Sequence, residues 1–270
     1  MFIKNCPIGV FDSGLGGLTA VREIKRIMPG EDIIYFGDTG RVPYGNRSRE
    51  TIIRYTKEDI EFLLRHDIKL IIAACGTASS VALPKLYDKY DIKIMGVLEG
   101  ACKEAVSVTR NKRVGVIGTA GTVKSGKYAE LINSLDPNVQ VFSNACPMFV
   151  PLVENGYSES RAAELIANDY LLPLKNEKVD TLILGCTHYP LLTKVISDIM
   201  GDEVTLLSPG ALAAQEAKAY LEKENLLSDK KQGVSEFYVS DSVDDFAQLG
   251  STFLGETINT SVHLTEVFEQ

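Results

Sequence analysis

The sequence predicts an α/β protein made of two similar parallel-sheet domains related by pseudo-two-fold symmetry, with an active site between them. Three observations support this prediction. Short apolar runs alternate with helix-like stretches along the chain, a pattern typical of mostly parallel sheets. Segments of the first half recur in the second half at a nearly constant offset. A chain of 270 residues is also long enough for two domains of ordinary size.

Nine apolar runs are predicted to be strands, because uninterrupted apolar segments are typical of strands buried in a parallel sheet. They are Ile8–Phe11, Asp32–Phe36, Leu70–Ala74, Ile94–Val97, Arg113–Gly118, Val139–Phe142, Thr181–Leu184, Val204–Leu207 and Phe237–Ser240. Two helices are clear between them. Ser48–Arg65 places Ile53, Ile60 and Leu64 on one face, and Ala211–Glu224 is rich in strong helix formers. Both are expected to pack on the outside of a sheet.

The internal repeat rests on four matches in the same order. Ser13 and Thr119 follow similar strands 106 positions apart, and Phe36 and Phe142 are also 106 apart. Pro43 and Pro151 are separated by 108 positions. The fourth match pairs Ala74-Cys75-Gly76-Thr77 with Gly185-Cys186-Thr187-His188, whose cysteines lie 111 positions apart. Each cysteine comes where a strand ends, and in open α/β sheets ligands bind at that edge.

The repeat predicts the domain limits. Residues 98–207 form the second domain, and residues 1–97 together with 208–270 form the first, because a fresh strand-helix-strand begins after Leu207. Two links would then join the domains, which suits a hinge. Each domain would offer one cysteine to a shared cleft.

Composition excludes several classes of protein. Hydrophobic residues make up 45% of the chain and charged residues 24%, as in a soluble globular protein. No apolar run approaches the roughly 20 residues needed to span a bilayer, and Met1–Pro7 is too short and polar for a signal peptide, so we expect a cytoplasmic protein without a membrane partner. The net charge of −8 argues against nucleic-acid binding. Five irregularly spaced cysteines are expected to be thiols.

Two glycine-rich turns are candidate anion sites. Asp12–Gly17 follows a strand and opens a helix, so its backbone N–H groups can hold an anion. Gly118–Thr122 repeats this arrangement with hydroxyl groups, and a carboxylate would suit such donors. The simpler alternative is that both are only tight strand-to-helix turns.

Cys75 and Cys186 are candidate acid/base residues because the repeat places them at equivalent strand ends. A thiolate accepts a proton and a neutral thiol donates one, so two facing thiols could remove a proton from one side of a carbon and return one on the other. The alternative is that they are buried small apolar residues, as free cysteines often are. Cys6, Cys102 and Cys146 have no repeat partner and are expected to serve packing.

Asp12, Glu154 and His188 are the ionisable residues expected to tune the two thiols. His188 lies two positions from Cys186, whereas Asp12 shares the first half of the chain with Cys75. A metal site is not expected, since Cys186 and His188 supply at most two ligands. Redox use is disfavoured because no C-x-x-C motif occurs. No lysine suggests a pyridoxal Schiff base, so we expect no cofactor.

Several motifs resemble those of the glutamate racemase family, within the aspartate/glutamate racemase superfamily. The resemblance extends over nearly the whole chain and is carried by Val10–Gly14, Tyr35–Thr39, Arg41–Gly45, Gly118–Thr122, Ala145–Pro147, Phe149–Glu154 and Leu184–Pro190. It implies a cofactor-independent homodimeric enzyme, an isomerase, that interconverts L- and D-glutamate for peptidoglycan synthesis, cell wall biogenesis and cell shape.

The resemblance also implies individual roles. Cys75 and Cys186 would be the acid/base pair, with Asp12 assisting Cys75, and Glu154 and His188 assisting Cys186. The positions that match substrate-holding residues are Ser13, Pro43, Tyr44, Gly45, Gly76, Thr77, Thr119, Thr122 and Thr187.

The chain departs from the family pattern beside Cys75, where Gly76 replaces the usual Asn. Loss of one hydrogen bond to a charged ligand costs roughly 1.5–3 kcal/mol, or about tenfold to a hundredfold in binding or rate. The alternatives are therefore a racemase of another acidic amino acid such as aspartate, or an impaired amino-acid-binding protein; a thiol-redox protein is least favoured. Glu99 and Ser208-Pro209-Gly210 also differ and are expected to alter loops.

Overall fold

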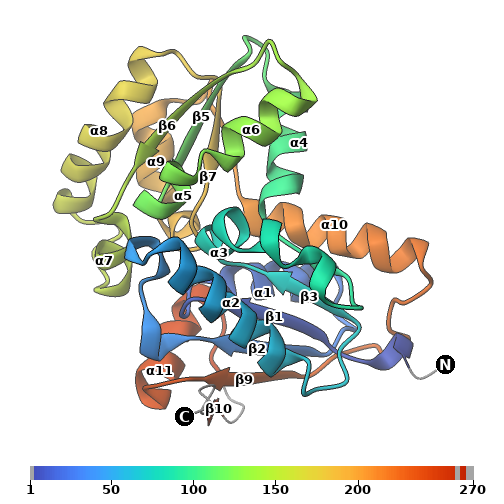
Figure 1. Ribbon diagram of the computed structural model, residues 1–270. Helices are drawn as coiled ribbons and strands as arrows, with labels where there is room; N and C mark the ends of the chain where they lie inside the picture. The colour runs from blue at the N-terminus through green and yellow to red at the C-terminus, as the bar shows by residue number, and fades with distance from the viewer. Residues whose placement is uncertain (1–2, 259–261, 266–270) are drawn as a thin grey trace.

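Two all-parallel sheets carry the fold in the computed structural model, which describes residues 3–258 and 262–265 (Figure 1). The first sheet has the strand order β10-β9-β2-β1-β3-β4 and the second has the order β6-β5-β7-β8. The first contains β1 (Ile8–Asp12), β2 (Ile33–Gly37), β3 (Leu70–Ala73), β4 (Ile94–Met95), β9 (Ser235–Val239) and β10 (Val262–Leu264). The second contains β5 (Arg113–Gly118), β6 (Gln140–Ala145), β7 (Thr181–Leu184) and β8 (Thr205–Leu207).

Helices connect the strands and cover the sheets. The α-helices are α1 (Leu18–Ile27), α2 (Arg49–Leu63), α3 (Gly76–Val81), α4 (Leu98–Val108), α5 (Ala120–Ser125), α6 (Lys127–Leu135), α7 (Phe149–Glu154), α8 (Arg161–Asn176), α9 (Thr193–Met200), α10 (Pro209–Lys223) and α11 (Val243–Leu254). Short 3-10 helices are η1 (Ile3–Asn5), η2 (Thr39–Arg41), η3 (Tyr44–Asn46), η4 (Leu83–Lys85), η5 (Tyr87–Lys89) and η6 (Tyr189–Leu192). In the described part of the chain, none of these helices has the length and apolar character needed to cross a bilayer.

The strand order confirms that the fold repeats. The order β2-β1-β3-β4 of the first sheet is the same as the order β6-β5-β7-β8 of the second, with β1 equivalent to β5 and β3 to β7. Every residue of β1, β2, β3 and β7 is buried, which explains why these segments are apolar without alternation. Cys75 follows β3 and Cys186 follows β7, so the two thiols occupy equivalent places.

The predicted helices form, but their packing differs from expectation in two details. α2 begins after Ser48, whose side chain accepts a hydrogen bond from Thr51 N, and its buried face contains Ile52, Ile60 and Leu63. Leu64 is 39% exposed, so its predicted place on the buried face is wrong. Leu63 is buried instead, because it continues the helical spacing of the buried residues Ile52, Thr56 and Asp59.

α10 does not cover a sheet from outside, as the sequence suggested. It packs against α1 and α4 and crosses the space between the two sheets, where it is drawn in orange in Figure 1. Some strand limits also differ from the prediction. β6 runs on to Ala145, β4 ends at Met95, and β10 was not predicted.

The C-terminal part returns to the first sheet. β9 pairs in parallel with β2, and α11 packs against α1. Domain limits at residues 97 and 207 stay a prediction, because α4 and α10, which follow these limits, pack against each other. Residues 1–2, 259–261 and 266–270 of the predicted first domain lie outside the described residues.

Candidate active site

A cavity of about 300 Å³ lies between the two sheets, where β1, β3, β5 and β7 end. Both cysteines that follow equivalent strands line it. Of the predicted site residues, those on its wall are Ser13, Pro43, Tyr44, Gly45, Cys75, Gly76, Thr77, Thr119, Glu154, Cys186, Thr187 and His188. Parallel strands present their carboxyl ends at one edge of a sheet, so the repeat brings these residues face to face.

Cys75 is buried at the start of α3. Its Sγ donates a hydrogen bond to Ser13 Oγ at 3.6 Å and accepts one from Ala78 N at 3.4 Å. Burial raises the pKa of the Cys75 thiol to about 12, and the charge of Asp12 adds to this effect. At neutral pH Cys75 is therefore a neutral thiol, which is a proton donor.

Cys186 has a charged neighbour instead. Its Sγ lies 3.9 Å from His188 Nδ1, and His188 Nε2 lies 2.9 Å from Glu154 Oε1. The ring of Phe253 packs edge-on against His188, with ring centroids 5.0 Å apart. Burial lowers the pKa of His188, but the hydrogen bonds with Cys186 and Glu154 outweigh it and raise the pKa to about 10. His188 therefore places a positive charge next to the Cys186 sulfur.

Asp12 does not lie on the cavity wall. It is buried below the turn that follows β1, where its carboxylate accepts hydrogen bonds from Gly14 N at 3.1 Å and Thr187 Oγ1 at 3.5 Å. Burial raises the pKa of Asp12, and the nearby His188 opposes this shift. Asp12 thus links the end of β1 to the loop that carries Cys186.

The turn after β1 also contacts the loop that carries Cys186 directly. A Cβ on Gly16 would lie 2.3 Å from Thr187 Oγ1 and 2.5 Å from His188 Nδ1, so only glycine leaves room for them. Thr19 Oγ1 donates a hydrogen bond to Thr187 O at 3.1 Å. In this turn, which was predicted as an anion site, Gly16 therefore holds the second sheet's loop while Ser13 and Gly14 face the cavity.

Thr77 and Thr119 line the cavity, and Thr122 supports both. Thr77 Oγ1 lies 2.9 Å from Thr119 Oγ1 and 3.3 Å from Thr122 Oγ1. Thr122 is buried behind the other two and does not line the cavity, so any effect of Thr122 on a ligand would pass through them. The hydroxyl cluster joins α3 of the first sheet to α5 of the second.

A buried network holds the loop after β2. Tyr44 Oη bonds both Asp38 Oδ2 and, at 2.8 Å, Asp59 Oδ2. The Arg41 guanidinium contacts Asp38 at 2.5 Å, Asp59 at 3.1 Å, and Glu58. Tyr44, predicted to hold substrate, lines the cavity, while its hydroxyl belongs to this network.

Gly76 lies against the backbone of the other sheet. A Cβ at this position would be 2.4 Å from the carbonyl oxygen of Gly185, a contact that real side chains do not make. The Asn expected from the family pattern therefore does not fit unless the backbones separate. The departures at Glu99 and Ser208–Gly210 lie outside the cavity, where Glu99 accepts a hydrogen bond from Tyr87 Oη at 2.8 Å.

Sequence reasoning missed several wall residues. Cys146, assigned to packing, is fully buried and also lines the cavity, together with Val42, Asn46, Pro147 and Val150. Their signal was available, because Cys146-Pro147 follows the strand equivalent to β2. In the described residues, no group of three or more His, Cys, Asp and Glu side chains is placed to hold a metal ion.

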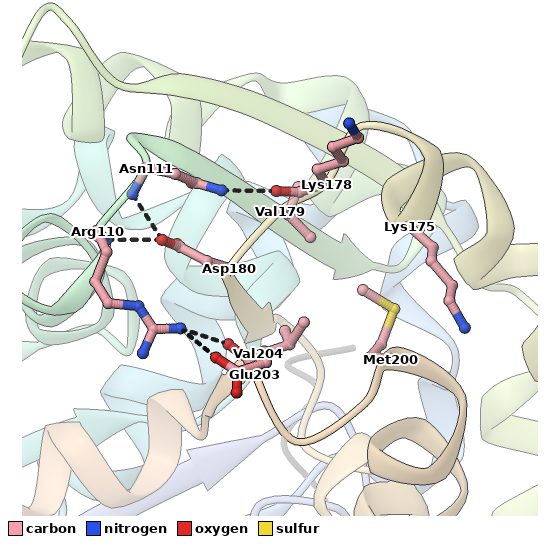
Figure 2. Close-up of a pocket in the computed structure, with 9 residues that line it drawn as sticks. All are labelled: Arg110, Asn111, Lys175, Lys178, Val179, Asp180, Met200, Glu203 and Val204. Carbon is pink, nitrogen blue, oxygen red and sulfur yellow. Dashed lines mark hydrogen bonds and ion pairs between the residues drawn. The ribbon is translucent and has the colours of Figure 1, made fainter.

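A cavity of about 340 Å³ at the other end of the second sheet has a different character (Figure 2). It lies where β5 and β7 begin. The Asp180 carboxylate accepts hydrogen bonds from Arg110 N and Asn111 N, both at 2.7 Å, and Lys175 Nζ donates one to Ile199 O. These groups satisfy one another and brace the turns, so we assign this cavity no chemistry.

Comparison with known proteins decides the family. Residues 8–217 match the model of the Asp/Glu/Hydantoin racemase family. The chain belongs to this family. A glutamate racemase of Geobacter metallireducens is 47% identical over 249 residues, which cover 92% of each chain. Because racemases are isomerases, the chain is an isomerase.

Solved structures of the family share the fold. A glutamate racemase isoform from Bacillus anthracis superposes with a TM-score of 0.94 at 38% identity, covering 97% of this chain and 98% of that one. The glutamate racemase from Francisella tularensis, solved in complex with D-glutamate, has a TM-score of 0.92 at 36% identity over 98% of each chain.

Proposed function

We propose that this racemase interconverts L- and D-glutamate without a cofactor, using Cys75 and Cys186 as its two acid/base residues. The observation that carries the proposal is that both thiols line one cavity, each at the equivalent strand end of a different sheet. Racemisation requires a proton to leave one face of the α-carbon and another to arrive on the opposite face. Two thiols from opposite sheets meet this requirement.

In one direction the Cys186 thiolate removes the α-proton. The C–H bond breaks, an S–H bond forms, and the electron pair stays on the substrate as a carbanion. The Cys75 thiol then gives its proton to the other face of the carbon and becomes a thiolate. In the reverse direction the two thiols exchange roles. General acid/base catalysis by positioned groups contributes about 10²–10⁴-fold.

His188 and Glu154 act on Cys186 in this proposal. Glu154, 2.9 Å from His188 Nε2, keeps the imidazole charged and aims Nδ1 at the sulfur. Cys75 has no such partner, and Asp12 acts on it by charge through the buried turn. The Cys75 side therefore starts as the proton donor and the Cys186 side as the acceptor.

Neutral donors hold the substrate. No Lys or Arg of the described chain lines the cavity. The carboxylates of the substrate would therefore be bound by N–H and O–H groups. We assign this role to Ser13, Thr77, Thr119 and Thr187, with Thr122 supporting the threonines. Pro43, Tyr44, Gly45 and Gly76 shape the wall.

We propose glutamate instead of aspartate as the substrate, because the matched relatives with 42–47% identity are glutamate racemases. Gly76 is the main reason to test this preference, since it replaces a polar side chain beside Cys75. A protein that only binds amino acids would have no use for the Cys186–His188–Glu154 chain.

The experiment follows α-proton exchange in deuterium oxide together with optical rotation, using both enantiomers of glutamate and of aspartate. Cys75→Ala and Cys186→Ala are each expected to lower glutamate racemisation at least about a hundredfold. Cys6→Ala is the control, because Cys6 lies outside the cavity. Binding of glutamate without exchange in the unmodified protein would overturn the proposal.

The cellular role follows from the same proposal. A cytoplasmic racemase of this kind would supply D-glutamate for peptidoglycan and would work as a homodimer. Growth of a bacterium that requires D-glutamate tests the first point, since expression of this chain should remove the requirement. Light scattering of the purified protein tests the second, and a monomeric mass would contradict it.

A further inference from the structure

Tyr35, in the middle of β2, is a buried polar residue to which the proposed reaction assigns no role. Its Oη donates a hydrogen bond to Gly14 O at 2.8 Å. Burial raises the pKa of Tyr35 well above its usual range, and the charges of Asp12 and Cys75 add to this effect. The hydroxyl group therefore keeps its proton and remains a donor to this carbonyl oxygen.

The backbone of Gly14 is held on both sides of its Cα. Its N–H group donates to Asp12 Oδ2 at 3.1 Å, and its carbonyl oxygen accepts from Tyr35. The same carbonyl oxygen lies against Gly37, where a Cβ would approach it to 2.4 Å. Because glycine has the freest backbone of all residues, Gly14 would adopt other conformations without these contacts. Tyr35 and Asp12 together therefore fix the turn after β1.

This turn carries the hydroxyl group that contacts the Cys75 thiol. Ser13 precedes Gly14 directly, and Ser13 Oγ lies 3.6 Å from Cys75 Sγ. Both Ser13 and Cys75 line the cavity. Since Gly14 N belongs to the peptide bond that joins it to Ser13, a change in the Gly14 backbone moves the Ser13 hydroxyl relative to the sulfur. The Tyr35 hydroxyl is thus connected to Cys75 through two adjacent residues.

The second sheet holds its corresponding turn in a different way. β6 is the strand equivalent to β2, and its residues, Gln140–Ala145, include no tyrosine. The turn after β5 is held instead by Thr119, whose side chain accepts a hydrogen bond from Thr122 N at 3.2 Å. The contact made by Tyr35 therefore belongs to the half of the fold that carries Cys75.

We propose that Tyr35 is a positioning residue for Cys75, acting through Gly14 and the Ser13 hydroxyl. The inference rests on the two-thiol reaction proposed above. It assigns Tyr35 to one of the two proton transfers, the one between Cys75 and the α-carbon. A displaced Ser13 would slow this transfer and leave the transfer at Cys186 unchanged.

Primary deuterium isotope effects on kcat/KM separate the two proton transfers. In Tyr35→Phe the transfer at Cys75 becomes slower and limits the rate more. The isotope effect should therefore rise for the α-deuterated glutamate enantiomer that Cys75 deprotonates, and fall for the other enantiomer. His188→Asn, which impairs the Cys186 side, should change the two isotope effects in the opposite sense. In Tyr35→Phe, kcat/KM should fall about tenfold for both enantiomers, because one hydrogen bond to a buried group is lost.

Tyr238→Phe is the matched control. Tyr238 lies on β9, the strand next to β2, and its Oη donates to Glu236 Oε2 at 2.9 Å. This change should leave kcat/KM and both isotope effects as they are. Tyr35→Phe is expected to fold, since it keeps the ring that packs against Phe237 and Phe246.

Gly37→Ala tests the same contact from another direction, because its Cβ would push against the Gly14 carbonyl oxygen. Its isotope effects should change in the same sense as those of Tyr35→Phe. Unchanged isotope effects in Tyr35→Phe, or changes in the sense of His188→Asn, would overturn the inference while the proposed racemase activity stands. A lack of racemisation in the unmodified protein would instead overturn the proposed function, and this inference with it.

Discussion

The loops that follow β3 and β7 occupy equivalent places in the two sheets, yet they put their thiols in opposite surroundings. Cys75 is buried, and its hydrogen bonds are with a hydroxyl and a backbone N–H group. Cys186 is partly exposed and lies beside a histidine that is paired with a carboxylate. The repeated backbone therefore fixes where the thiols are, while a few side chains determine what surrounds each of them. Symmetric chemistry at one carbon does not require a symmetric site.

The largest expected effect comes from removing the charged partner of Cys186. His188→Asn should lower glutamate racemisation by about 10²–10⁴-fold, because the thiolate loses its neighbouring positive charge. The measurement is kcat and KM for both enantiomers, with kcat carrying most of the loss.

The control is His263→Asn, since His263 lies on β10 and does not line the cavity. If His188→Asn keeps full kcat in both directions, His188 does not assist Cys186, and the different surroundings of the two thiols do not affect the reaction rate.

The charged state of His188 should also make the unfolding free energy of the protein depend on pH. The pKa of His188 is about 10 in the folded protein against a usual value of 6.5, so folding favours its charged form. Its contribution is then fully present below about pH 6.5 and is lost as the pH rises towards about 10. The difference in unfolding free energy between the unmodified protein and His188→Asn should shrink by roughly 2–4 kcal/mol over this range. Urea unfolding at both ends of the range measures it, and a constant difference would contradict the charged histidine.

The sequence predicted the placement of the thiols much better than their surroundings. Apolar runs ending at Cys75 and Cys186 sufficed to place both at strand ends, because strand position follows from hydrophobic patterning. The pairing of His188 with Glu154 depends on α7 folding back towards η6, a contact 34 positions apart that no local pattern encodes. Likewise, the turn at Gly16 was interpreted as an anion site. Its contact with Thr187 could not be predicted, because the two residues lie far apart in the sequence.

The residue after each thiol gives the next prediction. Thr187 follows Cys186 and uses its side chain, whereas Gly76 follows Cys75 and has no space for one. Gly76→Asn should cost about 1–3 kcal/mol of unfolding free energy, because its Cβ would collide with the Gly185 carbonyl oxygen and push the sheets apart.

Gly126→Asn is the matched control. Gly126 has a φ of +65° with open space around it, and Asn tolerates this left-handed conformation better than most residues. It should cost less than about 1 kcal/mol. A Gly76→Asn protein that is more stable than the original would mean that the close contact with Gly185 is not a feature of the folded state.

The smallest expected effect concerns how the two sheets hold their outer loops. After β6, Tyr189 Oη donates a single hydrogen bond to Cys146 O at 3.0 Å. After β2, one Tyr44 hydroxyl faces two carboxyl groups, and its one proton cannot serve both. Burial raises the pKa of Asp59 well above its usual range, and the charge of Asp38 adds to this shift. We predict that the Asp59 carboxyl group shares a proton with Tyr44 Oη, while Tyr44 donates to Asp38.

Asp59→Asn tests this assignment because an amide can replace a protonated carboxyl group. Its N–H would donate to Tyr44 and its oxygen would accept from Arg41, so the change should cost less than about 1 kcal/mol. Tyr44→Phe should cost about 1–3 kcal/mol, since it removes the hydrogen bond at the buried Asp59 Oδ2 and one of those at Asp38. Thermal and urea unfolding of both variants measure the contrast. If Asp59→Asn proves as costly as Tyr44→Phe, Asp59 is a carboxylate, and the loop is held by charge pairing with Arg41 instead of by a shared proton.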